Sequence, residues 1–182
     1  MIRAMITGHR PNKLSGYGPS PLQDAIRLWM HAELTALLAT HGTDLRVISG
    51  MALGVDMWWA EEALALDVPL HAYVPFAGQE NVWPRASQEH YQSLIERAEV
   101  VVICSEGGYG ASKMQLRNKR MVDDADVHLA VWDGTPGGTA NCVHYMGQQG
   151  ITPRRFPGLP ATITTTAVPP PAQQVLFRAG SS

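Results

Sequence analysis

The stretch LRVISGMALGVDMWWAEEALAL, residues 45–66, decides the fold of this chain. Its first five residues form an apolar run typical of a short buried strand, and the residues from 55 onward have the composition of a helix. Between them lies a turn that contains Gly50 and Gly54. A strand that leads through a glycine turn into a helix is the repeating unit of α/β proteins with a parallel sheet. We therefore expect this segment to be one unit of an α/β fold.

The same alternation continues on both sides of this segment. Further apolar runs predict strands at residues 2–7, 69–74, 100–104 and 127–132. Helices are expected at residues 21–41, 87–98, 113–124 and from 139 to about 147. Because right-handed crossovers place helices on both faces of a parallel sheet, the pattern predicts a Rossmann-like three-layer sandwich with a mostly parallel sheet of five or more strands.

The first helix shows both its start and its buried face. Ser20, Pro21 and Gln23 have the spacing of a capping box with proline at the first helical position. Apolar residues then recur on one face, at Ile26, Met30, Leu34, Leu37 and Leu38. This face is expected to pack on the sheet.

Length and composition predict one domain with a tail. The 182 residues, of which 45% are hydrophobic, are enough for a single packed core. From residue 157 the composition changes to Pro, Thr, Ala and Gln, which disfavours a core there. We expect a Rossmann-like domain over residues 1–156 and a mobile tail over residues 157–182.

Charge and residue usage exclude several classes of protein. The net charge of −2 disfavours a protein that binds nucleic acid mainly through its phosphates. No window approaches the roughly 18 consecutive apolar residues of a membrane span. Cys104, Cys142 and the seven histidines lack the spacings of a disulfide framework or a metal site. We expect a cytoplasmic protein with no metal site.

Glycines gather where the predicted strands end. Ten of the 17 glycines come just after a strand: Gly8, Gly50, Gly54, Gly78, Gly107, Gly108, Gly110, Gly134, Gly137 and Gly138. One glycine turn is typical of any α/β protein, but several turns at one sheet edge indicate a ligand crevice. Glycine also lets backbone N–H groups approach an anion. The edge is therefore expected to bind a phosphate-bearing, nucleotide-like ligand.

Two of these turns lead straight into helices. They are residues 49–56 (SGMALGVD) and 134–139 (GTPGGT). A helix N-terminus has unpaired N–H groups and about half a positive charge, which suits a phosphate. Neither turn matches G-x-G-x-x-G or G-x-x-x-x-G-K-[ST], so ordinary NAD dehydrogenases and P-loop ATPases are disfavoured.

The combined motifs resemble the SLOG superfamily, which joins the Smf/DprA and LOG-like proteins, and its YpsA-like branch in particular. The motifs that carry the resemblance are residues 7–11 (TGHRP), 49–56, 117–118 (RN), 121–123 (MVD) and 137–139, supported by Pro75, Phe76, Gln79, Trp83 and Tyr91. The resemblance covers residues 2–150. It implies a Rossmann-like fold that binds nucleotides or nucleotide-derived signals.

One departure from the LOG pattern bears on catalysis. LOG-type phosphoribohydrolases carry P-G-G-x-G-T-x-x-E, whereas here Gly138 and Thr139 are followed by Ala140, Asn141 and Cys142. Cleavage of an N-glycosidic bond needs a carboxylate to activate water or to stabilise charge. The weak replacement candidates near strand ends are Glu106, Asp56 and Asp133, of which Asp56 could equally start a helix and Asp133 equally stabilise a turn.

Several side chains near strand ends are candidates for ligand binding. Arg10 and Arg117 could clamp phosphate oxygens. Trp83 could stack on a base, Asn118 could read ribose or base, and His9 could donate to a phosphate or to a turn carbonyl. The expected nucleotide- and phosphate-binding residues are Thr7, Gly8, His9, Arg10, Ser49, Gly50, Met51, Ala52, Gly54, Asp56, Trp83, Arg117, Asn118, Gly134, Gly137, Gly138 and Thr139. Trp58 and Trp59, which open a helix, are expected in the core.

These features favour a module that binds a nucleotide or nucleotide-derived signal, such as an ADP-ribose-like ligand, and that forms a homo-oligomer. No cofactor is certain. The alternatives are a hydrolase of a nucleotide N-glycosidic or phosphoribosyl bond, and a protein that binds single-stranded DNA. The negative net charge makes nucleic acid the less expected partner.

Overall fold

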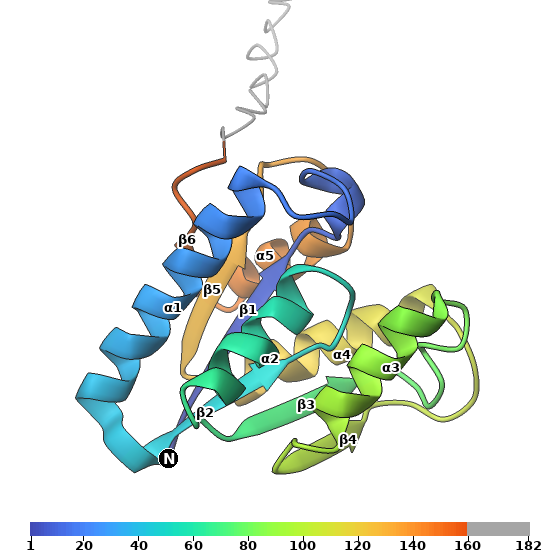
Figure 1. Cartoon of the computed structure of the whole chain (residues 1–182), viewed down its shortest axis with the longest axis horizontal. Coiled ribbons are helices and arrows are strands. Elements are labelled where there is room, and N and C mark those ends of the chain that lie inside the picture. The colour runs from blue at the N-terminus through green and yellow to red at the C-terminus, as the bar shows by residue number, and fades with distance from the viewer. Residues whose placement is uncertain (160–182) are drawn as a thin grey trace, which may run out of the picture.

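A computed structural model of the chain describes residues 1–159, in which strands alternate with helices as the sequence predicts (Figure 1). The strands are β1 (Ile2–Gly8), β2 (Leu45–Ser49), β3 (Leu70–Val74), β4 (Val100–Ile103), β5 (Val127–Val131) and β6 (Arg154–Arg155). The α-helices are α1 (Pro21–His41), α2 (Val55–Ala65), α3 (Arg85–Ile95), α4 (Ala111–Asp124) and α5 (Gly138–Gln148). Two short 3-10 helices, η1 (Pro11–Lys13) and η2 (Gly42–Asp44), follow β1 and α1.

All the strands pair in parallel in one sheet, with the order β4-β3-β2-β1-β5-β6. The chain builds outward from β1 to β4 and then returns to the other side of β1, where Ala4 pairs with Val127 of β5. The predicted α/β fold with a parallel sheet is confirmed. In open α/β sheets the strand order reverses where ligands bind, and here that reversal lies between β1 and β5.

Helices cover both faces of the sheet. Side chains of α1, α2 and α3 pack with Ala4 and Ile6 in the larger hydrophobic cluster. Side chains of α4 and α5 pack with Met5 on the opposite face in a second cluster. Successive residues of β1 thus serve opposite faces, as the pleat of a strand requires. The predicted three-layer arrangement follows from these two clusters.

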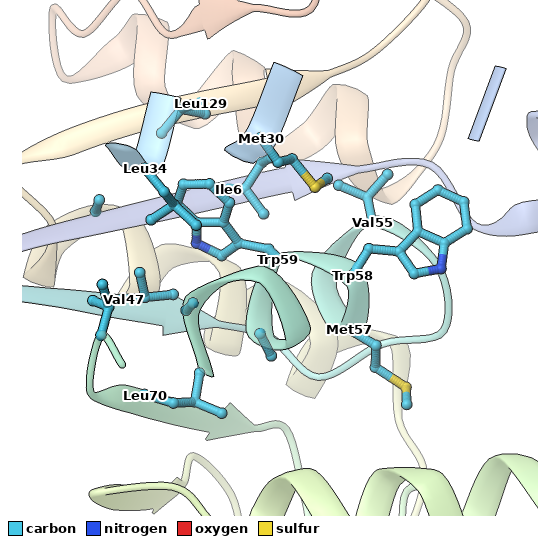
Figure 2. Packing of buried hydrophobic residues seen from close by; sticks show 14 of the residues in the cluster. Ile6, Met30, Leu34, Val47, Val55, Met57, Trp58, Trp59, Leu70 and Leu129 are labelled. Carbon is cyan, nitrogen blue, oxygen red and sulfur yellow. The ribbon is translucent and has the colours of Figure 1, made fainter. Parts of the chain in front are cut away.

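Helix α2 lies at the centre of the larger cluster. Figure 2 shows the Trp59 indole close to Leu34 of α1 and Ile6 of β1. Trp59 is fully buried and Trp58 is 8% exposed, so both tryptophans belong to the core as expected. Most of α2 is apolar on every side, as is typical of a buried helix. Its one buried carboxylate, Asp56, therefore needs a partner.

The start of α1 follows the predicted pattern. Ser20 Oγ accepts a hydrogen bond of 3.1 Å from the backbone N–H of Gln23, and Pro21 is the first helical residue. The buried residues Ile26, Met30, Leu34 and Leu37 confirm the predicted face.

After β6 the chain stays on the domain up to Leu159, which packs against the larger cluster. The tail expected over residues 157–182 lies outside the described residues from 160 onward. Within residues 1–159, no helix has both the length and the hydropathy needed to cross a membrane.

Candidate functional site

A pocket of about 380 Å³ opens at the carboxyl ends of β1 and β5, where the strand order reverses. Its walls come from the end of β1 and the loop after it, the turn before α2, one face of α4 and the start of α5. The lining residues are Ile6, Thr7, Gly8, His9, Arg10, Asn12, Lys13, Ala52, Asp56, Tyr109, Met114, Arg117, Asn118, Met121, Gly137, Gly138 and Thr139. Segments far apart in the sequence therefore meet in one cavity.

The start of α5 offers free backbone donors to this pocket. The residue before the helix is Gly137, with a φ of 147°, and it supplies no side-chain cap. Within residues 1–159, no acceptor pairs with the backbone N–H groups of Gly138, Thr139 and Ala140. The first N–H groups of a helix carry a partial positive charge. This corner of the pocket can therefore accept an anion.

Three positive side chains line the same pocket. Lys13 Nζ donates to the carbonyl of Pro136 at 2.7 Å and lies beside the Gly137 turn. Arg10 is exposed on the lining, and no carboxylate within residues 1–159 pairs with it. Arg117 is the third cation, whereas Asp56 is the only carboxylate among the described lining residues. The pocket is therefore electropositive.

The Asp56 carboxylate and the Arg117 guanidinium form a buried ion pair. Arg117 Nη1 lies 3.1 Å from Asp56 Oδ2, and both side chains are less than 10% exposed. Burial raises the pKa of Asp56, although the charge of Arg117 opposes this shift. The pair packs directly on Gly50, where a Cβ would lie 1.5 Å from Arg117 Nη1. Gly50 thus leaves the room that the pair occupies in this arrangement.

The turn between β2 and α2 is held by hydrogen bonds within the protein. Ser49 Oγ donates to the carbonyl of Asp56 at 2.6 Å and accepts from the N–H of Met51 at 3.1 Å. Gln79 Nε2 donates to the Met51 carbonyl at 3.1 Å. These hydrogen bonds hold the backbone of Met51 at a φ of 56°, in the left-handed region. Ser49 and Met51 therefore shape the wall of the pocket but do not line it.

A second polar contact links the loops after β1 and β5. His9 Nε2 lies 2.7 Å from Asp133 Oδ1, which also accepts hydrogen bonds from the N–H and the hydroxyl of Thr135. Burial opposes ionisation of Asp133, but the hydrogen bonds from Thr135 and His9 outweigh it and lower the pKa of Asp133 below its ordinary value. The carboxylate fixes the turn that contains Gly134, whose φ is 92°.

The structure brings most of the predicted site residues together, but not all of them. Trp83 does not line the pocket. Its ring packs against that of Tyr91, with the ring centroids 5.6 Å apart, beside the larger cluster. Of the carboxylate candidates, Glu106 is exposed away from the lining, and Asp133 is engaged in its turn. Asp56 alone reaches the pocket, where Arg117 holds it.

Sequence reasoning missed several lining residues, which are Ile6, Asn12, Lys13, Tyr109, Met114 and Met121. A signal for two of them was present. Met114, Arg117, Asn118 and Met121 stand at positions i, i+3, i+4 and i+7 of α4, so they share one helix face. Once Arg117 is a candidate, this spacing predicts that Met114 and Met121 lie beside it.

The sequence matches a protein family and several bacterial proteins. Residues 4–152 match the model of a family described as the YspA SLOG family. The uncharacterized SPbeta prophage-derived protein YoqJ of Bacillus subtilis (strain 168) is 30% identical over 124 residues, which cover 59% of this chain and 72% of that protein. A UPF0398 protein of Lysinibacillus sphaericus is 28% identical over 152 residues, covering 80% of this chain and 84% of the relative.

Solved structures share the fold at low sequence identity. DNA processing protein A (DprA) of Streptococcus pneumoniae superposes with a TM-score of 0.62 at 14% identity, over 85% of this chain and 50% of that one. DNA processing protein A of Helicobacter pylori gives a TM-score of 0.60 at 18% identity, over 88% and 69%. The chain thus spans half the length of the pneumococcal protein.

Proposed function

Because the chain belongs to the YspA SLOG family, we propose that its pocket binds a nucleotide or a nucleotide-derived ligand, with a phosphate at the start of α5. This membership confirms the resemblance to the YpsA-like branch that the motifs predict.

One observation carries the proposal. Free backbone donors at Gly138 to Ala140 lie beside Lys13, and Arg10 lines the same pocket. None of these groups has a carboxylate partner within residues 1–159. Donors and positive charge without a counter-charge are the ordinary features of a phosphate site at a helix N-terminus. A phosphate would complete this arrangement.

The rest of the pocket suits the remainder of a nucleotide. Its volume of about 380 Å³ lies within the range typical of small-molecule sites. Asn118, 9% exposed, reaches the Gly138 carbonyl at the long distance of 3.5 Å, so its amide is available to a ribose hydroxyl or a base edge. Polar and apolar side chains thus line the same cavity.

Hydrolysis of an N-glycosidic bond is the alternative, and within the described lining it would depend on Asp56. That carboxylate accepts a hydrogen bond from Arg117, and its pKa is raised by burial, as in some catalytic acids. The same contacts also serve to hold the pocket wall. We therefore propose binding without cleavage, and incubation with nucleoside monophosphates and ADP-ribose tests this point. Release of free base would favour the hydrolase.

Single-stranded DNA is a further candidate, since DNA processing protein A of Helicobacter pylori binds it. The net charge of −2 on this chain makes binding through many phosphates weak. A pocket with a few cations suits one or two phosphates better than a long strand.

Titration calorimetry with nucleoside monophosphates tests the proposed function. Wild type is expected to bind at least one member of the panel, and the double variant Arg10→Ala, Lys13→Ala to bind it at least about tenfold more weakly, because charge-assisted hydrogen bonds are lost. Arg85→Ala is the matched control, since this exposed arginine of α3 lies away from the pocket. Equal affinity in all three proteins would overturn the phosphate assignment.

A further inference from the structure

The ring of Tyr109 stands at the mouth of the pocket. Among the described lining residues it is the only Phe, Tyr or Trp side chain, and it is 79% exposed. A single exposed aromatic side chain is common on protein surfaces, so the exposure of Tyr109 alone does not indicate a ligand. Its place in the lining of the pocket makes the ring available to one.

Neighbouring groups hold this exposed ring in place. The rings of Tyr109 and Phe76 make an edge-to-face contact, with centroids 6.2 Å apart and an interplanar angle of 89°, and Phe76 is itself only 5% exposed. Lys113 Nζ donates to the carbonyls of Glu106 and Gly108, at 2.5 and 2.6 Å, in the loop that carries Tyr109. A ring whose position is set before binding loses little entropy when it receives a ligand.

Burial deepens along α4 from the mouth of the pocket to its floor. Met114, in the first turn of α4, is half-buried, Arg117 is 6% exposed and Met121 is 2% exposed. Tyr109 and Met114 therefore form the outer, apolar part of the lining. The phosphate-binding groups, by contrast, come from the loops after β1 and β5.

We propose that Tyr109 and Met114 form the base subsite, in which a planar nucleobase stacks on the tyrosine ring and contacts the methionine side chain. The inference rests on the proposed function and assigns the base to this side of the pocket, in place of Trp83. Every nucleobase has a π-face, so stacking binds bases with little selectivity, and a thioether adapts to flat surfaces of different shapes. The subsite therefore takes nucleotides as a class and tolerates several bases.

Comparison of a nucleotide with its base-free fragment tests this assignment. Calorimetry would compare AMP with ribose 5-phosphate on wild type, Tyr109→Leu and Tyr109→Trp. We expect Tyr109→Leu to weaken AMP binding by about tenfold, because a stacked base is lost. Its affinity for ribose 5-phosphate should stay within about twofold of wild type, and Tyr109→Trp should restore AMP binding.

Tyr17→Leu is the matched control, because Tyr17 is also exposed, at 69%, but does not line the pocket. An equal effect of Tyr109→Leu on both ligands, or no effect on AMP, would overturn the base subsite while leaving the phosphate site intact. If wild type bound no nucleotide more tightly than it bound ribose 5-phosphate, the base subsite would also be refuted. Failure of wild type to bind any of these phosphates would instead refute the proposed function, and the subsite with it.

Discussion

Individual glycines at this edge of the sheet have different structural roles, although they look alike in the sequence. At Gly50, behind the pocket wall, a Cβ would lie 1.5 Å from Arg117 Nη1 and 2.6 Å from Asp56 Oδ2, so a side chain there would displace the ion pair from its present position. At Gly138, which lines the pocket, a Cβ would meet no atom within 4 Å. A side chain at Gly138 would therefore extend into open space at the corner where we propose that a phosphate binds.

This contrast predicts opposite outcomes for two substitutions. Gly138→Val is expected to leave the thermal unfolding midpoint within about 2 °C of wild type while it abolishes nucleotide binding, because the added side chain shields the α5 donors. Gly50→Ala is expected to lower the free energy of unfolding by at least about 2 kcal/mol, because it displaces a buried ion pair. Calorimetric unfolding and ligand titration measure both quantities. Full binding by folded Gly138→Val would contradict the phosphate assignment.

The hydrogen bonds of Asp133 make its contribution to stability depend on pH. Its folded pKa is lowered, so its contribution to stability is fully present above the unfolded value of 3.8 and is lost as the pH falls through the folded pKa. Asp133→Asn is expected to lower the free energy of unfolding by about 1–2 kcal/mol at neutral pH, since hydrogen bonds to a charged group are weakened.

Urea unfolding at neutral pH and near pH 3 would measure this effect, with Asp44→Asn as the control for an exposed aspartate without a side-chain hydrogen bond in residues 1–159. The difference between Asp133→Asn and wild type should shrink toward pH 3, because below pH 3.8 the unfolded wild-type chain takes up a proton on this carboxyl while the folded protein keeps it ionised. A difference that grows on acidification would contradict the assigned direction of the pKa shift.

At the scale of elements, local sequence signals predict the helices and strands but not their surroundings. The start of α1 is visible in Ser20 and Pro21, because a cap depends on residues within one turn. The apolar run of β4 is equally visible, yet Val101 is 44% exposed because β4 lies at the edge of the sheet. Edge position depends on strand order, which no local pattern records.

At this scale we predict the effect on stability of removing the N-terminal cap of α1. Ser20→Ala is expected to lower the free energy of unfolding by about 1 kcal/mol, because the N–H of Gln23 loses its acceptor, and Ser20→Asp should restore the loss. Ser87→Ala in the first turn of α3 is the control, since no hydrogen bond of its hydroxyl is present in residues 1–159. Chemical denaturation measures the three variants. A loss as large in Ser87→Ala would show that the cap is not the cause.

At the scale of the whole molecule, charge bears on whether the chain binds a small nucleotide or a long nucleic acid. The chain carries a net charge of −2, while the pocket has cations that outnumber its one carboxylate. The net negative charge of the chain is therefore expected to disfavour the binding of a polyanion over a wide surface.

This distribution predicts weak binding of single-stranded DNA. Fluorescence anisotropy with a labelled oligonucleotide in physiological salt should give a dissociation constant of about 10 µM or weaker, and the weak signal should be displaced by a nucleotide that occupies the pocket. The double variant Arg10→Ala, Lys13→Ala should remove it. Submicromolar binding that mononucleotides do not displace would point to a DNA surface outside the pocket.

The sequence by itself determined the order of strands and helices, the buried face of α1 and the gathering of glycines at one sheet edge, because these depend on neighbours along the chain. It also pointed to Arg10, Arg117 and the turn before α5 as parts of one edge. The family resemblance added the expected kind of ligand, and membership of the family is confirmed.

Only the tertiary structure decided the order of the strands in the sheet. Because β5 returns beside β1, helix α4 must pass across the sheet from β4, and this crossing brings Arg117 and Tyr109 to the pocket. The loop after β3, in contrast, holds Trp83 against Tyr91, outside the lining. Strand order arises from packing between distant segments, so the composition of the pocket follows from the topology and not from any single motif.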